Sequence, residues 1–324
     1  MQNRLIWLDN LKGFLIILVV LGHAIQCVNP DFQHDILFRY IYSFHMPLFI
    51  FVSGYACYRN YIGWEMIKKR FTQLMVPYTV WSLIICITQG HLRLWEMFVF
   101  PERSLWFLYV LFFITVVHVL CVEVSGKFGL KEELVVPVVA IGLFASMIFF
   151  HSFGYPIIAK YFFYYCFGFY LRKCFSFKIS RLFMCYGVLV VFMIMAFFCM
   201  QDSVPSFMPT GSSKLYKCSY NTIVALTGIM SFMLLFANKV DKVWPAITKW
   251  GGVTLSIYAI HRSVGMFLIY KMSSIIGFDI SDLTTIQYYF AIFIVFVFLL
   301  VLSLLLNFLL EKYHYTRIAF LGKR

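Results

Sequence analysis

The sequence predicts an all-α, polytopic membrane protein with about ten transmembrane helices. Hydrophobic residues make up 62% of its 324 positions and charged residues only 13%, and the mean hydropathy is +0.84. A water-soluble domain usually carries about 25% charged residues, so this chain has too little charge to cover a water-facing surface. Lipid is therefore the expected solvent, and helices are expected because they satisfy backbone hydrogen bonds internally. We expect one domain, 1–324.

Apolar runs that are long enough, or nearly long enough, to cross a bilayer recur along the chain between polar or charged breaks. They lie near residues 11–28, 36–57, 74–88, 105–122, 134–150, 157–171, 182–200, 220–237, 253–270 and 288–310. The third run is short. Between the seventh and eighth runs, Pro205, Pro209 and Gly211 predict an irregular outer loop over 201–219 that could form part of a lid.

The net charge of +13 is best explained by membrane topology, although on a soluble protein it would suggest nucleic acid. With a cytoplasmic N-terminus and alternating spans, most of the Lys and Arg residues fall on the cytoplasmic side. These are Arg4, Lys12, Arg59, Lys68, Lys69, Arg70, Lys127, Lys131, Arg172, Lys173, Lys178, Arg181, Lys239, Lys242, Lys249, Lys312, Arg317, Lys323 and Arg324. We expect a multi-pass protein of the cell inner (plasma) membrane, with both termini cytoplasmic, membrane lipids around it and no nucleic-acid partner. The weakest point is Glu123–Glu133, where acids outnumber bases.

The cysteines indicate neither a disulfide framework nor a metal site. There are 9, and none forms a C-x-x-C pair. Most lie inside apolar runs, where a free cysteine behaves as a small buried hydrophobic residue. We therefore expect no bound metal.

The first run carries Asp9, Lys12 and His23, and ionisable groups inside a span usually need a partner or a function. Asp9 and Lys12 are three residues apart and can pair on one helical face. Lys12 and His23 are eleven residues apart, which returns to nearly the same face about 16 Å further along a helix. Alternatively, Lys12 anchors topology by snorkelling to the interface and His23 donates a helix-packing hydrogen bond.

This spacing suits a long molecule with an anionic head and a reactive tip. Coenzyme A has that form, with phosphates at one end and a thioester at the other. Lys12 would lie near the phosphates and His23 near the thioester. A histidine of ordinary pKa can be neutral at neutral pH and accept a hydroxyl proton.

Other polar residues have two interpretations each. His45, before Pro47, could line the same cavity, but a Pro-kinked helix whose histidine satisfies freed carbonyls is slightly favoured. The Lys68–Arg70 cluster could clamp phosphates or simply follow the positive-inside rule. Trp106 could be an interfacial anchor or a substrate platform, and His261 is a second-tier site candidate.

Five short motifs occur in order along nearly the whole chain. They are Leu8-Asp9-Asn10-Leu11-Lys12-Gly13 with Leu21-Gly22-His23, Met46-Pro47-Leu48-Phe49 with Ser53-Gly54-Tyr55, the basic cluster before Pro77-Tyr78, Leu105-Trp106-Phe107-Leu108, and Ser256-Ile257-Tyr258 with His261. In this order they resemble the membrane acyltransferase-3 family. The form of the first motif is most similar to the fucose O-acetylase-related branch.

The resemblance implies a ten-helix acyltransferase that uses a cytoplasmic acyl-CoA, usually acetyl-CoA, as co-substrate and holds no permanent cofactor. It also implies an acceptor hydroxyl on a carbohydrate, either a glycan or a lipid-linked sugar. Lys12 stands where the family typically has Arg, which keeps the charge but loses the planar fork. Gln73 stands where the family tends to have a second basic residue.

The resulting hypothesis is a membrane O-acetyltransferase in which His23 is the general base on the acceptor hydroxyl. A covalent acetyl-histidine is the variant mechanism. Asp9 orients Lys12, and His45 joins the catalytic group by positioning the acceptor or stabilising the oxyanion. The alternative is a transporter or flippase for a lipid-linked glycan, since intramembrane His and Lys also fit a substrate path.

The binding residues are assigned in two groups. The coenzyme-binding candidates are Lys12, Lys69, Arg70 and Trp106. The acceptor-binding candidates are Ser53, Tyr55 and His261.

Overall fold

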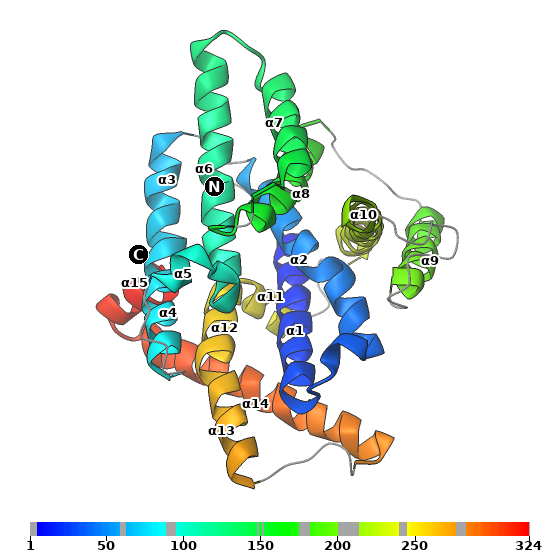
Figure 1. Ribbon diagram of the computed structural model, residues 1–324, viewed down its shortest axis with the longest axis vertical. Coiled ribbons are helices and arrows are strands. Elements are labelled where there is room, and N and C mark those ends of the chain that lie inside the picture. Colours follow the sequence, from blue (N-terminus) through cyan, green and yellow to red (C-terminus); the bar gives the residue numbers. More distant parts are fainter. Residues whose placement is uncertain are drawn as a thin grey trace. The chain divides into compact units, whose positions relative to one another are not determined.

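The computed structural model describes residues 5–58, 63–88, 95–147, 149–150, 152–174, 182–199, 214–239, 245–276 and 283–323. All regular structure in these ranges is helical, without a strand, which confirms the predicted all-α class, while the count of about ten spans stays a prediction (Figure 1). The chain groups into two compact units, each described by itself. Unit 1 comprises Met1–Phe49, Phe177–Thr254 and Ile269–Leu300, and unit 2 comprises Ile50–Ser176, Leu255–Leu268 and Val301–Arg324.

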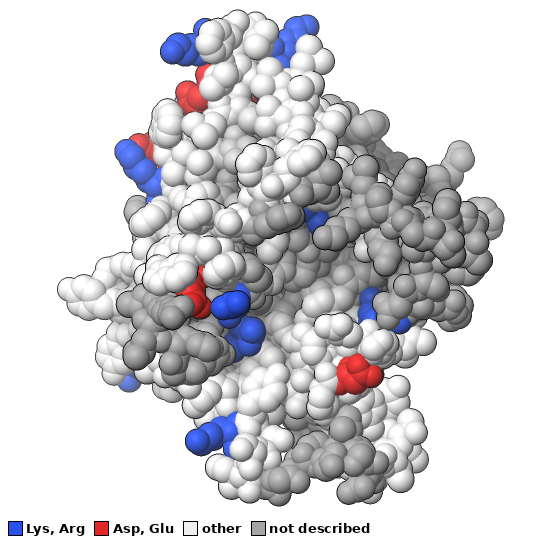
Figure 2. Space-filling view, in the orientation of Figure 1, with Lys and Arg blue, Asp and Glu red and all other residues white. Residues whose placement is uncertain are grey.

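Helices long and apolar enough to cross a bilayer recur through the described residues. There are 6 of them, Ile6–Val28, Ile36–Cys57, Trp64–Thr88, Trp106–Lys127, Ser219–Ala237 and Thr285–Glu311, and the broken pair Pro245–Gly251 and Thr254–Ile275 could count as a seventh. Helices also occupy the predicted runs near 134–150, 157–171 and 182–200. Among the described residues on the face shown in Figure 2, those other than Lys, Arg, Asp and Glu cover most of the surface, as expected for a protein in lipid.

Unit 1 is built around the first helix. Its elements are α1 (Ile6–Val28), η1 (Phe32–His34), the first part of α2 (Ile36–Cys57), α9 (Leu182–Cys199), α10 (Lys214–Lys239), α11 (Pro245–Gly251), most of α13 (Met266–Ile276) and the first part of α14 (Thr285–Glu311). Helix α1 packs against α11 and α10, and α10 packs against α9. The N-terminal half of α1 is therefore held by two neighbours.

Glycines bring α1 and α11 into backbone contact. A β-carbon at Gly13 would lie 2.0 Å from the carbonyl oxygen of Ile247, and one at Gly251 would lie 1.9 Å from that of Asp9. Small residues of this kind let helix backbones approach closely in lipid, where packing rather than the hydrophobic effect drives association. The Thr248 hydroxyl also donates a hydrogen bond to the Asn10 side chain. This contact fixes the part of α1 that carries the first motif.

Aromatic rings join α1 and α2 to α10. Phe14 lies 5.4 Å from Phe232 and 5.4 Å from Phe236, centroid to centroid. Phe44 stacks on Phe232 at 4.5 Å with an interplanar angle of 5°. Such pairs contribute about 0.5–1.5 kcal/mol beyond their buried area, so this cluster holds α1 and α2 against α10.

Unit 2 is organised around one long helix. Its elements are the end of α2, α3 (Trp64–Arg70), η2 (Phe71–Met75), α4 (Val76–Thr88), α5 (Glu96–Val99), η3 (Pro101–Arg103), α6 (Trp106–Lys127), α7 (Glu132–Ser146), α8 (Tyr155–Cys174), α12 (Thr254–Ile260), η4 (His261–Gly265), the start of α13, the end of α14 and α15 (His314–Leu321). Helix α6 packs against α3, α7 and α8, and α4 packs against α15 and η4. Figure 1 shows α6, α7 and α8 side by side.

The third span begins earlier than its apolar run predicted. The run near 74–88 is short, but the helix starts at Trp64 and continues through the π-helical turn η2 into α4. Residues 64–76 contain no glycine or proline, so nothing local stops the helix before Pro77. Proline removes one backbone hydrogen bond, and a π-turn is one way a helix accommodates such a break.

The predicted outer loop over 201–219 ends earlier than expected. Helix α10 begins at Lys214, and residues 201–213 lie outside the described residues. Apart from residues in that loop, Arg4, Arg59, Lys178, Arg181, Lys242 and Arg324 from the topology argument also lie outside them.

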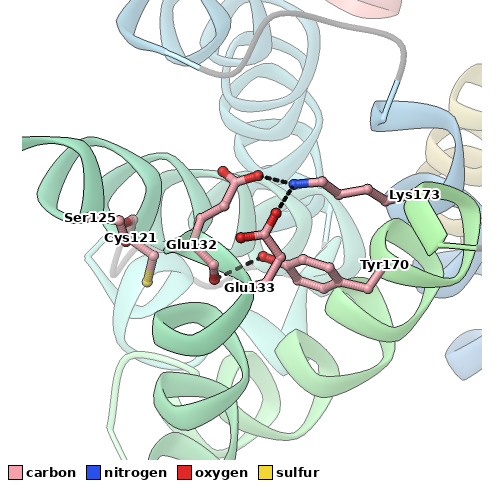
Figure 3. A network of polar contacts seen from close by, with 6 residues as sticks. All are labelled: Cys121, Ser125, Glu132, Glu133, Tyr170 and Lys173. Atoms are coloured by element: carbon pink, nitrogen blue, oxygen red, sulfur yellow. Dashed lines mark hydrogen bonds and ion pairs between the residues drawn. The ribbon is translucent and has the colours of Figure 1, made fainter. Parts of the chain in front are cut away.

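The acidic loop that weakened the topology prediction is neutralised by a lysine from α8. Lys173 Nζ lies 2.5 Å from Oε1 of Glu132 and 2.6 Å from Oε1 of Glu133 (Figure 3). The hydrogen bond from Lys173 holds the pKa of Glu133 below its ordinary value. Tyr170 donates a further hydrogen bond to the Glu132 carbonyl at 3.1 Å. The excess of acid at this end of α7 is therefore balanced by charge from α8.

The glycine contact between α1 and α11 makes a stability prediction. Gly251→Ala should lower the melting temperature of the detergent-solubilised protein, because the new β-carbon overlaps backbone and overpacking costs about 1–3 kcal/mol. Gly142→Ala on α7 is the matched control, since a β-carbon there meets nothing within 4 Å, and it should be neutral or stabilising. Equal melting temperatures for the two variants would contradict the contact.

Candidate functional site

Helix α1 presents Lys12 and His23 on one face. The helix is unbroken from Ile6 to Val28, so the two residues are about 20° apart around its axis and about 16 Å apart along it. Lys12 Nζ lies 3.7 Å from Oδ1 of Asp9, which confirms the predicted ion pair. The Lys12 and Asp9 side chains are 26% and 11% exposed, and His23 is half-buried. A charged pair and an imidazole therefore line one side of one helix.

Tyr42 connects the neighbourhood of His23 with His45. A β-carbon at Gly22 would lie 2.7 Å from Cε2 of Tyr42. The ring of Tyr42 in turn lies 4.5 Å from the ring of His45, edge to face. Within unit 1, Tyr42 thus contacts both His45 and the Gly22 position that precedes His23 in the chain.

His45 is fully buried and its tautomer follows from its partner. Nδ1 lies 2.7 Å from the carbonyl oxygen of Ile41, and since a carbonyl only accepts, Nδ1 must carry the proton. The lone pair of the neutral ring is then on Nε2. The favoured interpretation of His45 as a backbone-bonding histidine is consistent with this bond, although the carbonyl that Pro47 frees one turn earlier is that of Ser43, not Ile41.

The three adjacent cations at the start of the third span point in different directions. Lys68 is exposed and pairs with Glu65 at 2.8 Å. Lys69 is exposed, and Arg70 is half-buried, donating to the Gln73 side chain at 3.4 Å. Successive residues on a helix are about 100° apart, so they do not form one clamp. Arg70 is the cation that reaches inward.

The Ser53-Gly54-Tyr55 motif packs α2 against α8. A β-carbon at Gly54 would lie 2.0 Å from the Tyr165 carbonyl oxygen. The Arg172 guanidinium lies 4.8 Å from the centre of the Tyr55 ring and donates to the Tyr55 carbonyl at 3.2 Å. Arg172 therefore satisfies one of the terminal carbonyls of α2. Ser53 is half-buried beside this contact, and its role as an acceptor-binding residue stays a prediction.

Trp106 and His261 lie along one series of aromatic contacts in unit 2. Trp106 contacts Phe107, which meets Tyr258 at 5.7 Å, and Tyr258 contacts His261 at 6.0 Å. His261 is buried, with Nδ1 2.5 Å from the carbonyl oxygen of Ile257. The motifs from α6 and α12 are thus brought together, and His261 carries its proton on Nδ1 as His45 does.

His118 is a buried histidine that the sequence motifs did not reveal. It lies on α6, fully buried, and neither ring nitrogen has a hydrogen-bond partner among the described residues. Its ring meets Tyr165 at 5.4 Å and Phe169 at 4.7 Å. The only sequence signal was an ionisable residue inside the fourth apolar run.

These features define a class of protein: a helical membrane protein that keeps histidines, a lysine–aspartate pair and an inward arginine within its spans, as proteins with intramembrane sites do. The chain matches the acyltransferase domain of the Acyl_transf_3 family over residues 5–311 and belongs to that family. It is therefore a membrane acyltransferase.

The chain is also similar in part to two nodulation proteins NolL. The protein from Sinorhizobium fredii (strain NBRC 101917 / NGR234) is 42% identical over 91 residues, which are 26% of this chain and 25% of that protein. The protein from Mesorhizobium japonicum (strain LMG 29417 / CECT 9101 / MAFF 303099) is 32% identical over 116 residues, 32% of this chain and 28% of that protein. The chain thus spans little more than a quarter of these relatives' lengths. No solved structure matches it.

The Asp9–Lys12 pair makes a second stability prediction. Lys12→Met should lower the melting temperature, because it leaves the buried Asp9 without this cation; the loss should stay below the roughly 3–5 kcal/mol of a fully buried pair. The double variant Asp9→Asn with Lys12→Met should recover most of the loss, since no charge remains. A double variant no more stable than Lys12→Met would contradict the pairing.

Proposed function

We propose that this membrane acyltransferase moves an acetyl group from acetyl-CoA to a hydroxyl of a glycan or a lipid-linked sugar. The observation that carries the proposal is the placement of Lys12 and His23 on one face of α1, about 16 Å apart along its axis. That separation suits a thin acyl carrier with a phosphate head and a thioester tip. The family supplies the acyl transfer, and the first motif's likeness to the fucose O-acetylase-related branch supports acetyl as the group moved.

In the proposed reaction, His23 is the general base. One ring nitrogen of His23 takes the proton of the acceptor hydroxyl, while the oxygen of that hydroxyl attacks the carbonyl carbon of the thioester. The tetrahedral intermediate collapses, the C–S bond breaks, and the coenzyme thiolate takes the proton back from the imidazolium. The products are an acetyl ester and free coenzyme A. The Tyr42 ring contacts His45 and the Gly22 position that precedes His23, which supports a role for His45 in positioning the acceptor.

Lys12 is the proposed partner of the coenzyme phosphates, and Asp9 orients it at 3.7 Å. Lys69 and Arg70, in unit 2, are the other proposed cationic partners of the coenzyme, and Arg70 is the less exposed of the two. Acetyl-CoA is a co-substrate in this scheme, and no permanent cofactor is invoked.

In the proposed orientation, both termini lie on the cytoplasmic side of an inner membrane. Acetyl-CoA is available on that side. The alternative function, transport of a lipid-linked glycan, has no observation in its favour beyond the buried ionisable groups. Membership of an acyltransferase family favours group transfer over transport.

His23→Ala should abolish acetyl transfer. Membranes containing the variant are supplied with labelled acetyl-CoA, and acetylation of the glycan fraction is measured by mass spectrometry. Loss of a general base typically lowers the rate by about 10²–10⁴-fold. His34→Ala is the control, because His34 is 64% exposed on the short η1 turn, and it should retain the wild-type rate.

The decisive comparison is between the two histidine variants at equal protein level. If His23→Ala acetylates as fast as His34→Ala, His23 has no part in the chemistry and the proposed mechanism is wrong.

Lys12→Met should weaken acetyl-CoA binding rather than slow the chemistry. Removing one charge-assisted contact should raise the KM for acetyl-CoA about tenfold, since such contacts contribute about 1.5–3 kcal/mol. Lys12→Arg should stay near the wild-type KM because it keeps the charge. An unchanged KM in Lys12→Met, or an equal rise in both variants, would remove Lys12 from the coenzyme site.

A further inference from the structure

A cavity of about 390 Å³ lies where α6 and α8 begin. It is named here the Trp106 pocket, and its lining residues are Trp106, Met147, Pro156, Ile157, Lys160 and Tyr161. All of them belong to unit 2. Its volume lies within the range of about 300–1,000 Å³ that is typical of small-molecule sites.

The pocket combines an aromatic wall with a single cation. Trp106 and Tyr161 lie 5.3 Å apart with an interplanar angle of 36°. Lys160 Nζ lies 6.0 Å from the centre of the Tyr161 ring. Aromatic faces carry partial negative charge and so attract the polarised C–H groups of a pyranose ring, while an ammonium group beside them attracts an anion. Among the described residues that line the pocket, Lys160 is the only charged one.

The loop leading into α8 is held in a strained conformation beside the pocket. Phe153 has a positive φ of 55° and is followed by Gly154 at 66°, and a positive φ is uncommon for a bulky residue. The Phe153 N–H donates to the Val99 carbonyl at 3.0 Å. The Tyr155 and Ser146 hydroxyls share a hydrogen bond of 2.6 Å. Strain of this kind is kept where surrounding contacts over-determine it, often at functional sites.

The pocket lies at the opposite ends of α6 and α8 from Lys127, Arg172 and Lys173. Helix α6 runs 22 residues from Trp106 to Lys127, about 33 Å, and α8 ends with Arg172 and Lys173. On the positive-inside rule the basic ends face the cytoplasm, so the pocket opens on the other side. In the proposed function coenzyme A enters from the cytoplasm, which assigns this end of the helices, and Trp106 with it, to the acceptor rather than to the coenzyme-binding group expected from the sequence.

An interfacial anchor is the competing explanation for a tryptophan and a tyrosine at a helix end. Phe149, Phe150 and Phe153 near this end of α8 are 73%, 59% and 58% exposed, as expected of aromatic side chains that only contact the surrounding membrane. Trp106 instead is half-buried, lines a cavity and packs on Tyr161. The anchor explanation accounts for the phenylalanines and leaves the pocket unexplained.

We propose that the Trp106 pocket binds a sugar ring of the acceptor against Trp106 and Tyr161, and that Lys160 pairs with an anionic group on or next to that ring. The inference rests on the proposed function and deepens it, because it names the acceptor as an anionic saccharide. The anion is either a phosphate, as in a lipid-linked sugar, or the carboxylate of an acidic sugar.

The test measures saccharide binding to the purified full chain in nanodiscs by saturation-transfer NMR and titration, without acetyl-CoA. The probes are glucose 1-phosphate, glucuronate and the neutral methyl glucoside. At least one anionic probe should bind about tenfold more tightly than the neutral one. A preference for the phosphate indicates a lipid-linked sugar, and a preference for the carboxylate indicates an acidic glycan residue.

Variants assign the binding to the pocket. Lys160→Met should abolish the preference for anionic probes, and Lys160→Arg should keep it. Trp106→Leu should weaken the binding of all three probes. Lys271→Met is the matched control, because Lys271 is an exposed lysine on α13 in unit 1, and it should bind as the wild type does. Equal affinity for neutral and anionic probes, or a preference that survives in Lys160→Met, overturns the proposal.

Acetyl transfer separates this inference from the proposed function. If the wild type acetylates its glycan and Lys160→Met leaves the acceptor KM unchanged, the pocket assignment fails and the function stands. If the probes bind with the expected dependence on Lys160 but no acetyl transfer is found, the function fails and the pocket stands as a saccharide site. A higher acceptor KM with unchanged kcat in Lys160→Met supports both.

Discussion

The backbone contact between α1 and α11 is the interaction on which the proposed chemistry depends. A charged side chain inside a lipid-embedded helix needs a partner and a fixed position. Gly13 and Gly251 remove the side chains that would keep the two helices apart, and Asp9, whose carbonyl lies at that contact, supplies the partner for Lys12. The Lys12–His23 axis is therefore oriented by packing at its charged end, before any substrate binds.

Helix-level features of the fold could be predicted from the sequence, while contacts between helices could not. The apolar run from Leu11 and the spacing of Asp9, Lys12 and His23 determine one helix and one face, because helical periodicity is a local property. The extension of the third span to Trp64 was missed because polar residues precede its apolar run. Nothing local shows that Gly54 meets α8 or that Arg70 turns inward, since those outcomes depend on which helices pack together.

The buried histidines illustrate the same limit within the site. His45 and His261 each bond the carbonyl four residues earlier through Nδ1, which fixes the neutral tautomer and leaves the lone pair on Nε2. His118 shows no such bond among the described residues and lies between aromatic rings. All three appear in the sequence as histidines inside apolar runs. His23 differs from them because it lies at helical spacing from a charged pair on its own helix. Such a spacing can be recognised in the sequence.

The lysine at position 12 has a physical consequence of its own. An arginine there could bind the Asp9 carboxylate through two parallel hydrogen bonds. These bonds would immobilise the arginine and use much of its donor capacity. The ammonium of Lys12 instead lies 3.7 Å from one carboxylate oxygen, longer than a charge-assisted hydrogen bond of about 2.7–2.9 Å. A lysine ammonium carries three rotatable N–H donors on a compact charge, so one lysine can serve a carboxylate and a phosphate together. Loss of the planar fork therefore weakens bidentate recognition at this position without removing the electrostatic attraction that the proposed coenzyme contact requires.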